Sequence, residues 1–467
     1  MLPMPEHSHL VTPAQRKWLP LLTAVGFFMQ TLDGTILNTA LPSMAAALGE
    51  SPLQMQSVII AYMLTVALLI PASGWLADRF GTRRVYLAAI LLFTLGSLAC
   101  AAANSLPMLV AARVLQGVGG ALLMPIGRLA VLRVYSKHEL LRVMSFVTIP
   151  GLLGPLLGPA LGGWLVEVAS WHWVFLINLP VGVIGFIASW SFMPDLRQHT
   201  ARFDWQGFVL FSAGMVLVSV GLQGLGEHSI STGWALFAVL FGLAAMASYW
   251  LYAANTEQPL FSLALFQTST FAIGIWGNLF ARLGSGAMPF LTPLFLQLGL
   301  GFSPSKAGMT MIPTVIGAML TKTLVNKLIP KVGYRRILIV NTLALGVLIA
   351  SFSLIDNQVP HWLLLGWLMV FGAINSLQFS AMNTLTLQDL SADHASSGNG
   401  LLSVVMQLSM SLGVAIAASL LGLFSAGQPA EGSEQWLGGF HLTYLCIGLM
   451  SMLAALIFAQ LARKEQG

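Results

Sequence analysis

The stretch "GWLADRFGTRR", residues 74–84, ends one long apolar run and begins the next. Its aspartate can cap or pair at a helix end, and its second glycine allows a tight turn, because glycine adopts backbone conformations that other residues avoid. Its first glycine permits close helix packing, and its arginines anchor the loop in the cytoplasm. A basic anchor alone would not require this Gly-Asp-Gly framework. We therefore expect a functional loop that contains Gly74, Asp78, Arg79, Gly81, Arg83 and Arg84.

A second copy of the loop, "NKLIPKVGYRR" at residues 326–336, follows 252 residues later. Both copies contain a Gly-X-Arg-Arg turn, although the second has Pro330 where the first has Asp78. A repeat in the same orientation predicts two parallel halves related by an axis along the membrane normal. Secondary transporters use this arrangement for alternating access.

Composition places the chain in a membrane. Of its 467 residues, 57% are hydrophobic and 8% are charged, whereas a soluble domain has about 25% charged residues. The formal charge of +5 does not require nucleic acid, because basic residues collect on the cytoplasmic side of membrane proteins. Cys100 and Cys446 lie in apolar runs, so no disulfide framework or cysteine metal site is expected.

Fourteen segments of the chain are long and apolar enough to cross a bilayer, which takes about 20 residues. Lys and Arg fall on one side of these segments, and the loops on the other side hold only Lys306. Both termini are therefore expected in the cytoplasm. The expected spans are 18–41, 53–77, 85–103, 107–132, 143–168, 173–193, 205–223, 234–252, 269–297, 307–327, 337–355, 361–385, 399–424 and 438–461.

Asp33 is a carboxylate inside the first apolar run, in "QTLDGTILNTALP" at residues 30–42. An ionised carboxylate at such depth costs several kcal/mol unless it is paired, hydrated or protonated. Such residues commonly face a water-filled pathway or a proton relay. The alternative is a purely structural partner for a buried base.

The fourth span, "ARVLQGVGGALLMPIGRLAV", offers that partner. Arg113 lies at a depth similar to that of Asp33, and Gln116 shares its helix face. Arg128 falls on the same side near the cytoplasmic end, so one face is expected to carry two buried cations. Snorkelling could account for Arg128, but not easily for Arg113 or for Arg282 in the ninth span.

The fifth span contains "GLLGPLLGPALGGW" at residues 151–164. Glycines spaced by four residues let helix backbones approach closely, and prolines remove backbone donors from the helical ladder. A kinked helix with a smooth face is expected. The residues that define this pattern are Gly154, Pro155, Gly158, Pro159, Gly162 and Gly163.

The sequence contains no HExxH motif, no phosphate-cradling loop and no pair of buried carboxylates. We therefore expect neither an enzyme nor an ATP-driven pump, and we expect no cofactor or metal. The partners expected are protons, a small-molecule substrate and membrane lipid, with no nucleic acid.

Three stretches, "GWLADRFGTRR", "RVLQGVGG" and "GPLLGPALGGW", resemble the signature motifs of the major facilitator superfamily. "LDGTILNTALP" and two additional central spans preceded by "RFDWQG" resemble its fourteen-span drug:proton antiporters, the QacA/EmrB type. The resemblance implies an all-α fold of two six-helix bundles around a central cavity, with two additional helices. The division expected is a cytoplasmic tail over residues 1–17, a bundle over 18–193, additional helices and linkers over 194–268, a second bundle over 269–461 and a cytoplasmic tail over 462–467.

The resemblance also implies roles for residues. Asp33 matches the family's acidic residue of helix 1 and Arg113 its motif arginine of helix 4, so both are expected to couple protons. Asp78 and Arg79 match a cytoplasmic gating loop, and residues 154–163 contain the antiporter motif. The residues expected to line a substrate cavity are Asn38, Gln116, Arg128 and Arg282.

These features predict a monomeric proton-coupled exporter of small organic compounds or drugs in the bacterial inner membrane. The sign of the substrate stays open. Arg113, Arg128 and Arg282 against Asp33 give a net charge of about +2, which favours an organic anion or a metal-carboxylate chelate. The later spans also lack the second deep carboxylate that many family members carry. A channel or a sensor is the remaining alternative, although a channel needs no repeat and a sensor usually brings a soluble domain.

Overall fold

The computed structural model describes residues 11–198, 202–227, 231–425 and 433–461. Helices make up nearly all of this part of the chain, and no β-strand occurs in it, so the predicted all-α class is confirmed. The helices form two compact units, residues 1–203 and 204–467. The C-terminal tail expected at 462–467 and most of the N-terminal tail expected at 1–17 lie outside the described residues.

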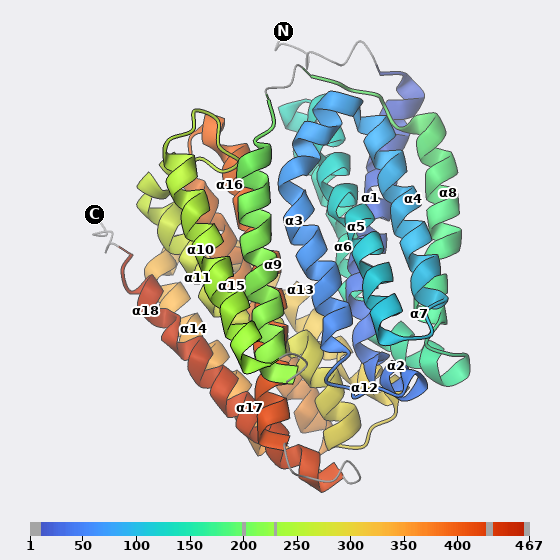
Figure 1. Ribbon diagram of the computed structural model, residues 1–467, viewed down its shortest axis with the longest axis vertical. Coiled ribbons are helices and arrows are strands. Elements are labelled where there is room, and N and C mark those ends of the chain that lie inside the picture. The colour runs from blue at the N-terminus through green and yellow to red at the C-terminus, as the bar shows by residue number, and fades with distance from the viewer. Residues whose placement is uncertain (1–10, 199–201, 228–230, 426–432, 462–467) are drawn as a thin grey trace. The chain divides into compact units, whose positions relative to one another are not determined.

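The first unit is a bundle whose long helices run side by side (Figure 1). The helix α1 packs mainly on α6, and α5 packs on both α3 and α4. Capping boxes start two of these helices, at Thr12 with Gln15 and at Ser136 with Glu139. The helices are α1 (Pro13–Ile36), α2 (Leu41–Leu48), α3 (Gln56–Phe80), α4 (Thr82–Ala101), α5 (Leu106–Val134), α6 (Lys137–Val168), α7 (Trp173–Leu176) and α8 (Asn178–Phe192), with the 3-10 turn η2 (Leu37–Thr39) after α1.

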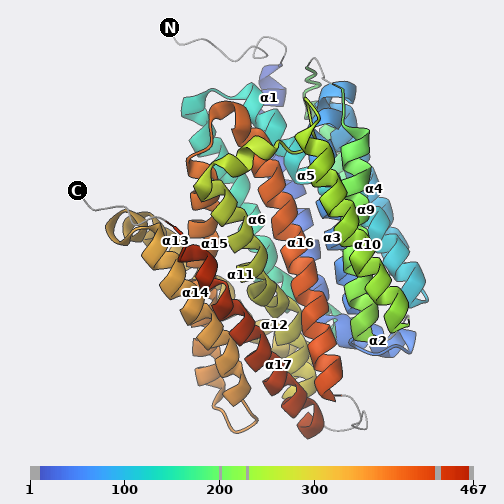
Figure 2. The ribbon, with the colours of Figure 1, turned by 60° about the vertical axis from the view of Figure 1, so that its left-hand side comes forward.

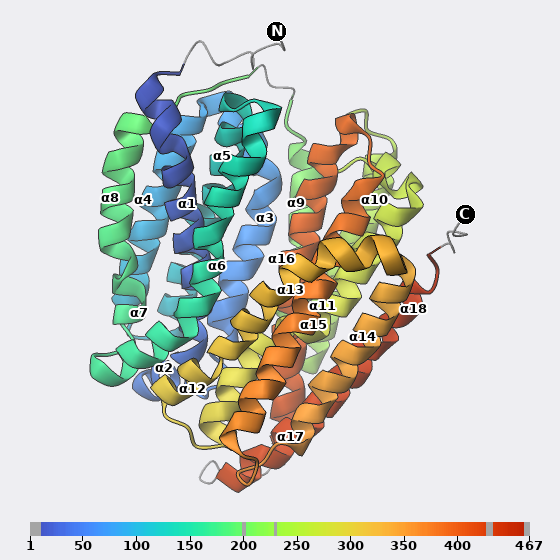
Figure 3. The same cartoon turned by 180° about the vertical axis from the view of Figure 1, so that it is seen from behind.

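The second unit begins with a helix pair, α9 and α10, which lie side by side (Figure 2). Beyond them, α13 packs on α15, α14 packs on α17, and α11 packs on α16 (Figure 3). The helices are α9 (Trp205–Glu227), α10 (Thr232–Ala254), α11 (Ser269–Leu294), α12 (Pro304–Thr310), α13 (Ile312–Val332), α14 (Tyr334–Ser351), α15 (His361–Gln388), α16 (Ala392–Ser425), α17 (Ser433–Leu453) and α18 (Ala455–Phe458).

Thirteen described helices are long and apolar enough to cross a membrane, and each matches an expected span. The fourteenth expected span corresponds to α13, which is a helix of 21 residues but is not among the thirteen. Its sequence contains Lys322, Lys327 and Lys331, which lower its hydropathy.

The predicted repeat is visible in the backbone. Gly81 ends α3 at φ 93° and ψ 143°, and Gly333 ends α13 at φ 83° and ψ 150°. Each glycine N–H donates to the carbonyl oxygen four residues earlier, at 2.9 Å in both copies. These positive φ angles favour glycine. The Gly-X-Arg-Arg turn therefore has the same geometry in both halves of the chain.

Hydrogen bonds to Asp204 connect the additional helices α9 and α10 with the chain that follows them. Its Oδ1 accepts from the backbone N–H of Gly207 at 2.8 Å and from the hydroxyl of Tyr252 at 2.8 Å. Its Oδ2 accepts from the N–H of Leu260 at 2.9 Å. In addition, α9 packs on α16, so both additional helices belong to the second unit.

Candidate functional site

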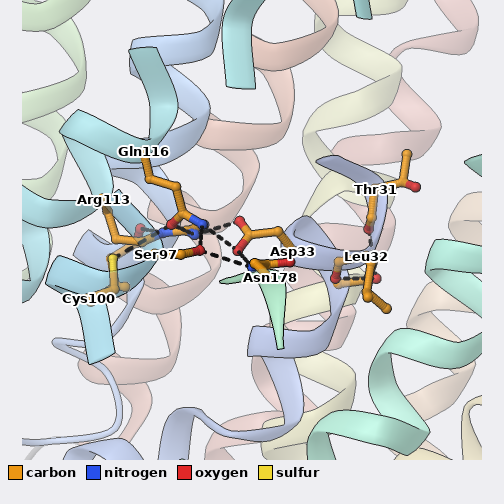
Figure 4. A network of polar contacts seen from close by, with 10 residues as sticks. Thr31, Leu32, Asp33, Ser97, Cys100, Arg113, Gln116 and Asn178 are labelled. Carbon is orange, nitrogen blue, oxygen red and sulfur yellow. Dashed lines mark hydrogen bonds and ion pairs between the residues drawn. The ribbon is translucent and has the colours of Figure 1, made fainter. Parts of the chain in front are cut away.

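A buried ion pair lies inside the first unit. Arg113 of α5 donates from Nη1 to Oδ2 of Asp33 in α1 at 2.6 Å, and both side chains are at most 2% exposed. The sequence predicted that Arg113 would contact Asp33 across these helices, and this contact is confirmed. Figure 4 shows the two side chains pointing toward one another from facing helices.

Neutral polar groups complete the network around the ion pair (Figure 4). Oδ1 of Asp33 accepts from the amides of Gln116 at 2.7 Å and Asn178 at 3.1 Å. The same two amides donate to Oγ of Ser97, at 2.7 Å and 3.0 Å. Oε1 of Gln116 in turn accepts from Arg113 Nη1 at 2.7 Å. Residues of four helices, α1, α4, α5 and α8, therefore form one hydrogen-bonded network around this carboxylate.

Aromatic rings enclose the guanidinium of Arg113. Its centre lies 4.2 Å from the ring centroid of Tyr62 and 5.9 Å from that of Phe175. Its Nε donates to the carbonyl oxygen of Val58 at 3.3 Å. Such an enclosure lowers the local dielectric, which strengthens the attraction to Asp33 and makes an unpaired charge costly.

The chemistry of the network follows from the direction of its hydrogen bonds. Every polar contact given above for Asp33 is a donor to its carboxylate, so the ionised form is fully matched. A protonated carboxyl group would need an acceptor. Oε1 of Gln116 already accepts from Arg113 and from the thiol of Cys100, so both of its lone pairs are used. Protonation of Asp33 therefore requires contacts between α1, α5 and α8 to rearrange.

A glycine stripe on α6 holds α1 in place. A Cβ atom at Gly154, Gly158 or Gly162 would lie between 2.1 and 2.3 Å from atoms of residues 31, 35 and 36. Thr35 and Thr39 donate across the contact to the carbonyl oxygens of Gly154 and Pro159, at 3.1 Å and 3.0 Å. The close approach predicted for glycines at four-residue spacing is confirmed. Gly163 is buried, and α6 runs as one helix through Pro155 and Pro159.

The loop after α3 makes polar contacts at the helix ends. Asp78 forms an ion pair with Arg133 at the end of α5, as expected of a residue that pairs there. Arg133 also donates to Oε1 of Gln198 at 3.0 Å. Arg83 donates to the carbonyl oxygen of Trp190 at the end of α8. Residues of this loop, at the end of α3 and the start of α4, therefore contact the ends of α5 and α8 in the first unit.

The remaining loop residues differ in their environment. Arg79 and Arg84 are exposed, as basic anchors at a membrane surface would be. The close packing expected at Gly74 is wrong, because a Cβ there would meet no heavy atom within 4 Å. At this position α3 therefore makes no close contact with another described helix of the first unit.

The same end of the first unit holds a second polar contact. Arg16 at the start of α1 forms an ion pair of 2.6 Å with Glu139 at the start of α6. The hydroxyl of Tyr135, in the turn before α6, donates to the carbonyl oxygen of Arg16. Burial raises the pKa of Tyr135 above its ordinary value, because desolvation disfavours the phenolate. The hydroxyl therefore remains a donor at neutral pH.

The residues expected to line a cavity differ in their environment. Gln116 is fully buried and belongs to the Asp33 network, and Asn38 is 4% exposed in η2. The expectation that Arg128 is a second buried cation on α5 is wrong, because its side chain is exposed. Near a helix end a long side chain can extend past the neighbouring helices. Arg282 is buried in the second unit.

Sequence reasoning missed Ser97, Asn178 and Tyr62. All three are uncharged polar residues inside apolar runs, and each is at most 4% exposed. Asp33 and Arg113 could be predicted because they are charged residues inside apolar runs. The neutral polar residues inside the apolar runs are the signal in the sequence that includes Ser97, Asn178 and Tyr62.

Comparisons with known proteins agree with this architecture. A family model described as Major Facilitator Superfamily matches residues 23–414 and 276–466. A candidate multidrug resistance protein, MdtD, of Pectobacterium carotovorum subsp. carotovorum is 52% identical over 453 residues, which cover 96% of each chain. The MdtD protein of Cronobacter sakazakii is 52% identical over 448 residues, covering 96% of this chain and 95% of that one.

Solved structures share the fold at low sequence identity. A D-xylose–proton symporter superposes with a TM-score of 0.66 and 16% identity, covering 94% of this chain and 96% of the other. A POT family transporter in complex with 5-aminolevulinic acid gives a TM-score of 0.72 and 14% identity, covering 94% and 95%.

Proposed function

The chain belongs to the major facilitator superfamily, and we propose that it is a proton-coupled antiporter that exports small organic compounds, drugs among them, from the cytoplasm. Relatives that are 52% identical over most of their length are named for multidrug resistance. The observation that carries the proposal is the Asp33–Arg113 ion pair, buried among polar partners in the first unit. Intramembrane ionisable residues of this kind commonly belong to proton relays.

Proton coupling would use the two states of Asp33. In the ionised state its carboxylate accepts from Arg113, Gln116 and Asn178. A proton arriving from outside neutralises the carboxylate and weakens its attraction to Arg113. The amide donors of Gln116 and Asn178 then lose their preferred acceptor. The four helices of this network change their packing, and release of the proton to the cytoplasm restores it.

The loop at residues 74–84 would control the cytoplasmic side in this scheme. Asp78 pairs with Arg133, and Arg16 pairs with Glu139 at the same end of the unit. Breaking and forming such contacts would accompany each transport cycle. The glycine stripe of α6 would give α1 a smooth surface on which to move.

The setting that we propose is the inner membrane of a bacterium, with both termini in the cytoplasm and a monomer surrounded by lipid. The distribution of Lys and Arg supports this orientation. Residues 18–193 and 269–461 would be the two transport bundles. Residues 194–268 would be an accessory segment.

A second candidate function is export of an organic anion or a metal-carboxylate chelate. Arg113 is already neutralised by Asp33, and Arg128 is exposed, so neither adds a free buried charge. Arg282 is 6% exposed and forms none of the ion pairs found in the described residues. This buried cation, which lacks an ion pair among the described residues, is the observation that favours an anionic substrate.

Counterflow in proteoliposomes tests the carrier assignment. Vesicles are loaded with an unlabelled compound, and uptake of the labelled compound is followed for a panel of cationic dyes and a panel of organic anions. A carrier accumulates label transiently with at least one panel, and a pH-sensitive dye reports proton movement. Flux that dissipates gradients without counterflow would instead indicate a channel. Protein-free vesicles provide the background.

A further inference from the structure

The second unit holds a buried guanidinium whose partners are all neutral. Arg282 of α11 is 6% exposed, and its Nε donates to Oδ1 of Asn278 at 2.9 Å. Its Nη2 donates to Oδ1 of Asn383 in α15 at 3.2 Å. The ring of Phe379 covers the guanidinium at 4.2 Å from its centre. The side chain is therefore fixed by two helices and one aromatic face.

The charge of Arg282 has no counter-ion in the described part of the chain. The four ion pairs found there involve other residues, whereas Arg113, the comparable cation of the first unit, is paired with Asp33. A buried charge without an opposite charge carries a desolvation cost that neutral amides offset only in part. Binding of an external anion would remove this imbalance.

Unused donors lie beside the guanidinium. Arginine has five N–H groups, and the contacts above use two of them. Because arginine has only donors, Asn383 must present its oxygen to Arg282, which leaves its amide N–H groups free to point elsewhere. Asn278 differs, because its amide nitrogen already donates to Gly274 O at 2.9 Å and to Thr386 at 3.3 Å. The open donors therefore belong to Arg282 and Asn383.

We propose that Arg282 and Asn383 bind the carboxylate group of an organic anion that the protein transports. A guanidinium presents parallel N–H groups that match the two oxygens of a carboxylate, and stacking on Phe379 fixes its plane. Asn383 adds a donor from the neighbouring helix. This site rests on the export function proposed above and assigns a chemical class to its substrate.

The sharpest test is Asn383→Asp, which changes little in size. The new carboxylate takes the place of the oxygen now 3.2 Å from Nη2 and supplies an internal counter-ion to Arg282. We expect this variant to fold and to unfold at a higher temperature than the wild type. It should nevertheless lose carboxylate binding, because the external anion no longer has an unpaired cation to neutralise. Arg282→Gln should lose binding for lack of the charge.

Binding is measured on the purified protein by thermal stabilisation with benzoate, succinate and tricarballylate, each compared with its neutral amide. We expect at least one carboxylate to bind the wild type about tenfold more tightly than its amide. Both variants should reduce that preference about tenfold or more. Arg336→Gln removes the same charge from an exposed position on α14 and should leave the preference for the carboxylate unchanged.

Several outcomes would overturn the assignment. These are a panel in which no carboxylate binds better than its amide, unchanged binding in Arg282→Gln, or equally tight binding of inorganic phosphate. Counterflow and proton movement with a cationic dye, ethidium, are measured in the same variants. If carboxylate preference fails while the wild type still exchanges a compound for protons, only this site is refuted. If no exchange occurs with any compound, the export function itself fails.

Discussion

At the scale of single residues, the Asp33–Arg113 pair is held by opposing contributions. Removing both charges from water costs several kcal/mol per ion, and their attraction at 2.6 Å offsets this only with further hydrogen bonds. Those bonds come from Gln116 and Asn178 on the carboxylate and from Val58 on the guanidinium. The pair is therefore stable as a unit. The loss of either residue leaves the charge of the other unpaired in an interior of low dielectric constant.

This balance predicts a particular pattern of stability. Arg113→Gln should destabilise the protein by about 3–5 kcal/mol, because it leaves the Asp33 carboxylate buried and unpaired. The double variant Asp33→Asn with Arg113→Gln removes both charges and should recover much of that loss. Thermal unfolding of the purified proteins in detergent measures the difference. A double variant as unstable as Arg113→Gln alone would show that charge balance does not hold this site together.

The sequence could predict only part of this network. The contact between Asp33 and Arg113 was predictable, because both residues are charged and lie at similar depths in their spans. The structure confirms it. The exposure of Arg128 could not be read from its position on an ideal helix, because it depends on which neighbours cover that face. Ser97 and Asn178 carry no charge, and only tertiary packing brings them to the carboxylate.

At the scale of elements, the close contact between α1 and α6 depends on the glycines of α6, which have no side chain. Gly162→Ala would place a Cβ 2.1 Å from the carbonyl oxygen of Ile36, a backbone atom that cannot move without the helix. Overpacking of this kind typically costs about 1–3 kcal/mol. Gly185→Ala in α8 is the matched control, because a Cβ there meets nothing within 4 Å. We expect a lower unfolding temperature only for Gly162→Ala, and equal effects would contradict close packing at α6.

The two loop glycines allow a paired test of gating. Valine at Gly81 or Gly333 would be strained by about 1–3 kcal/mol, because both backbones have positive φ. Only at Gly81 would the new side chain also displace the carboxylate of Asp195, whose Oδ1 lies 2.0 Å from the Cβ position. We expect Gly81→Val to slow transport about tenfold, equivalent to about 1.4 kcal/mol in barrier, with substrate binding largely intact. Gly333→Val should have a smaller effect.

Transport rates and binding affinities of both valine variants are compared with the wild type in proteoliposomes. A loss of binding as large as the loss of transport in Gly81→Val would contradict a gating role. It would place the effect on the substrate site itself.

At the scale of the whole molecule, the repeated loop predicted the two-part organisation. Gly81 and Gly333 are 252 residues apart and share one backbone geometry, which a sequence pattern can reveal because only glycine suits that conformation. The attachment of α9 and α10 to the second unit was not predictable in the same way. It depends on the hydrogen bonds of Asp204 and on packing against α16, which are tertiary contacts without a local sequence pattern.

The central claim is that Asp33 couples protons to export, and Asp33→Asn tests it most directly. Asparagine keeps the size of the side chain and can still accept from Arg113, but it cannot take up or release a proton. Counterflow and substrate-induced proton movement are measured side by side in proteoliposomes. We predict that Asp33→Asn retains counterflow and loses proton movement. Normal proton-driven export by this variant would contradict the account.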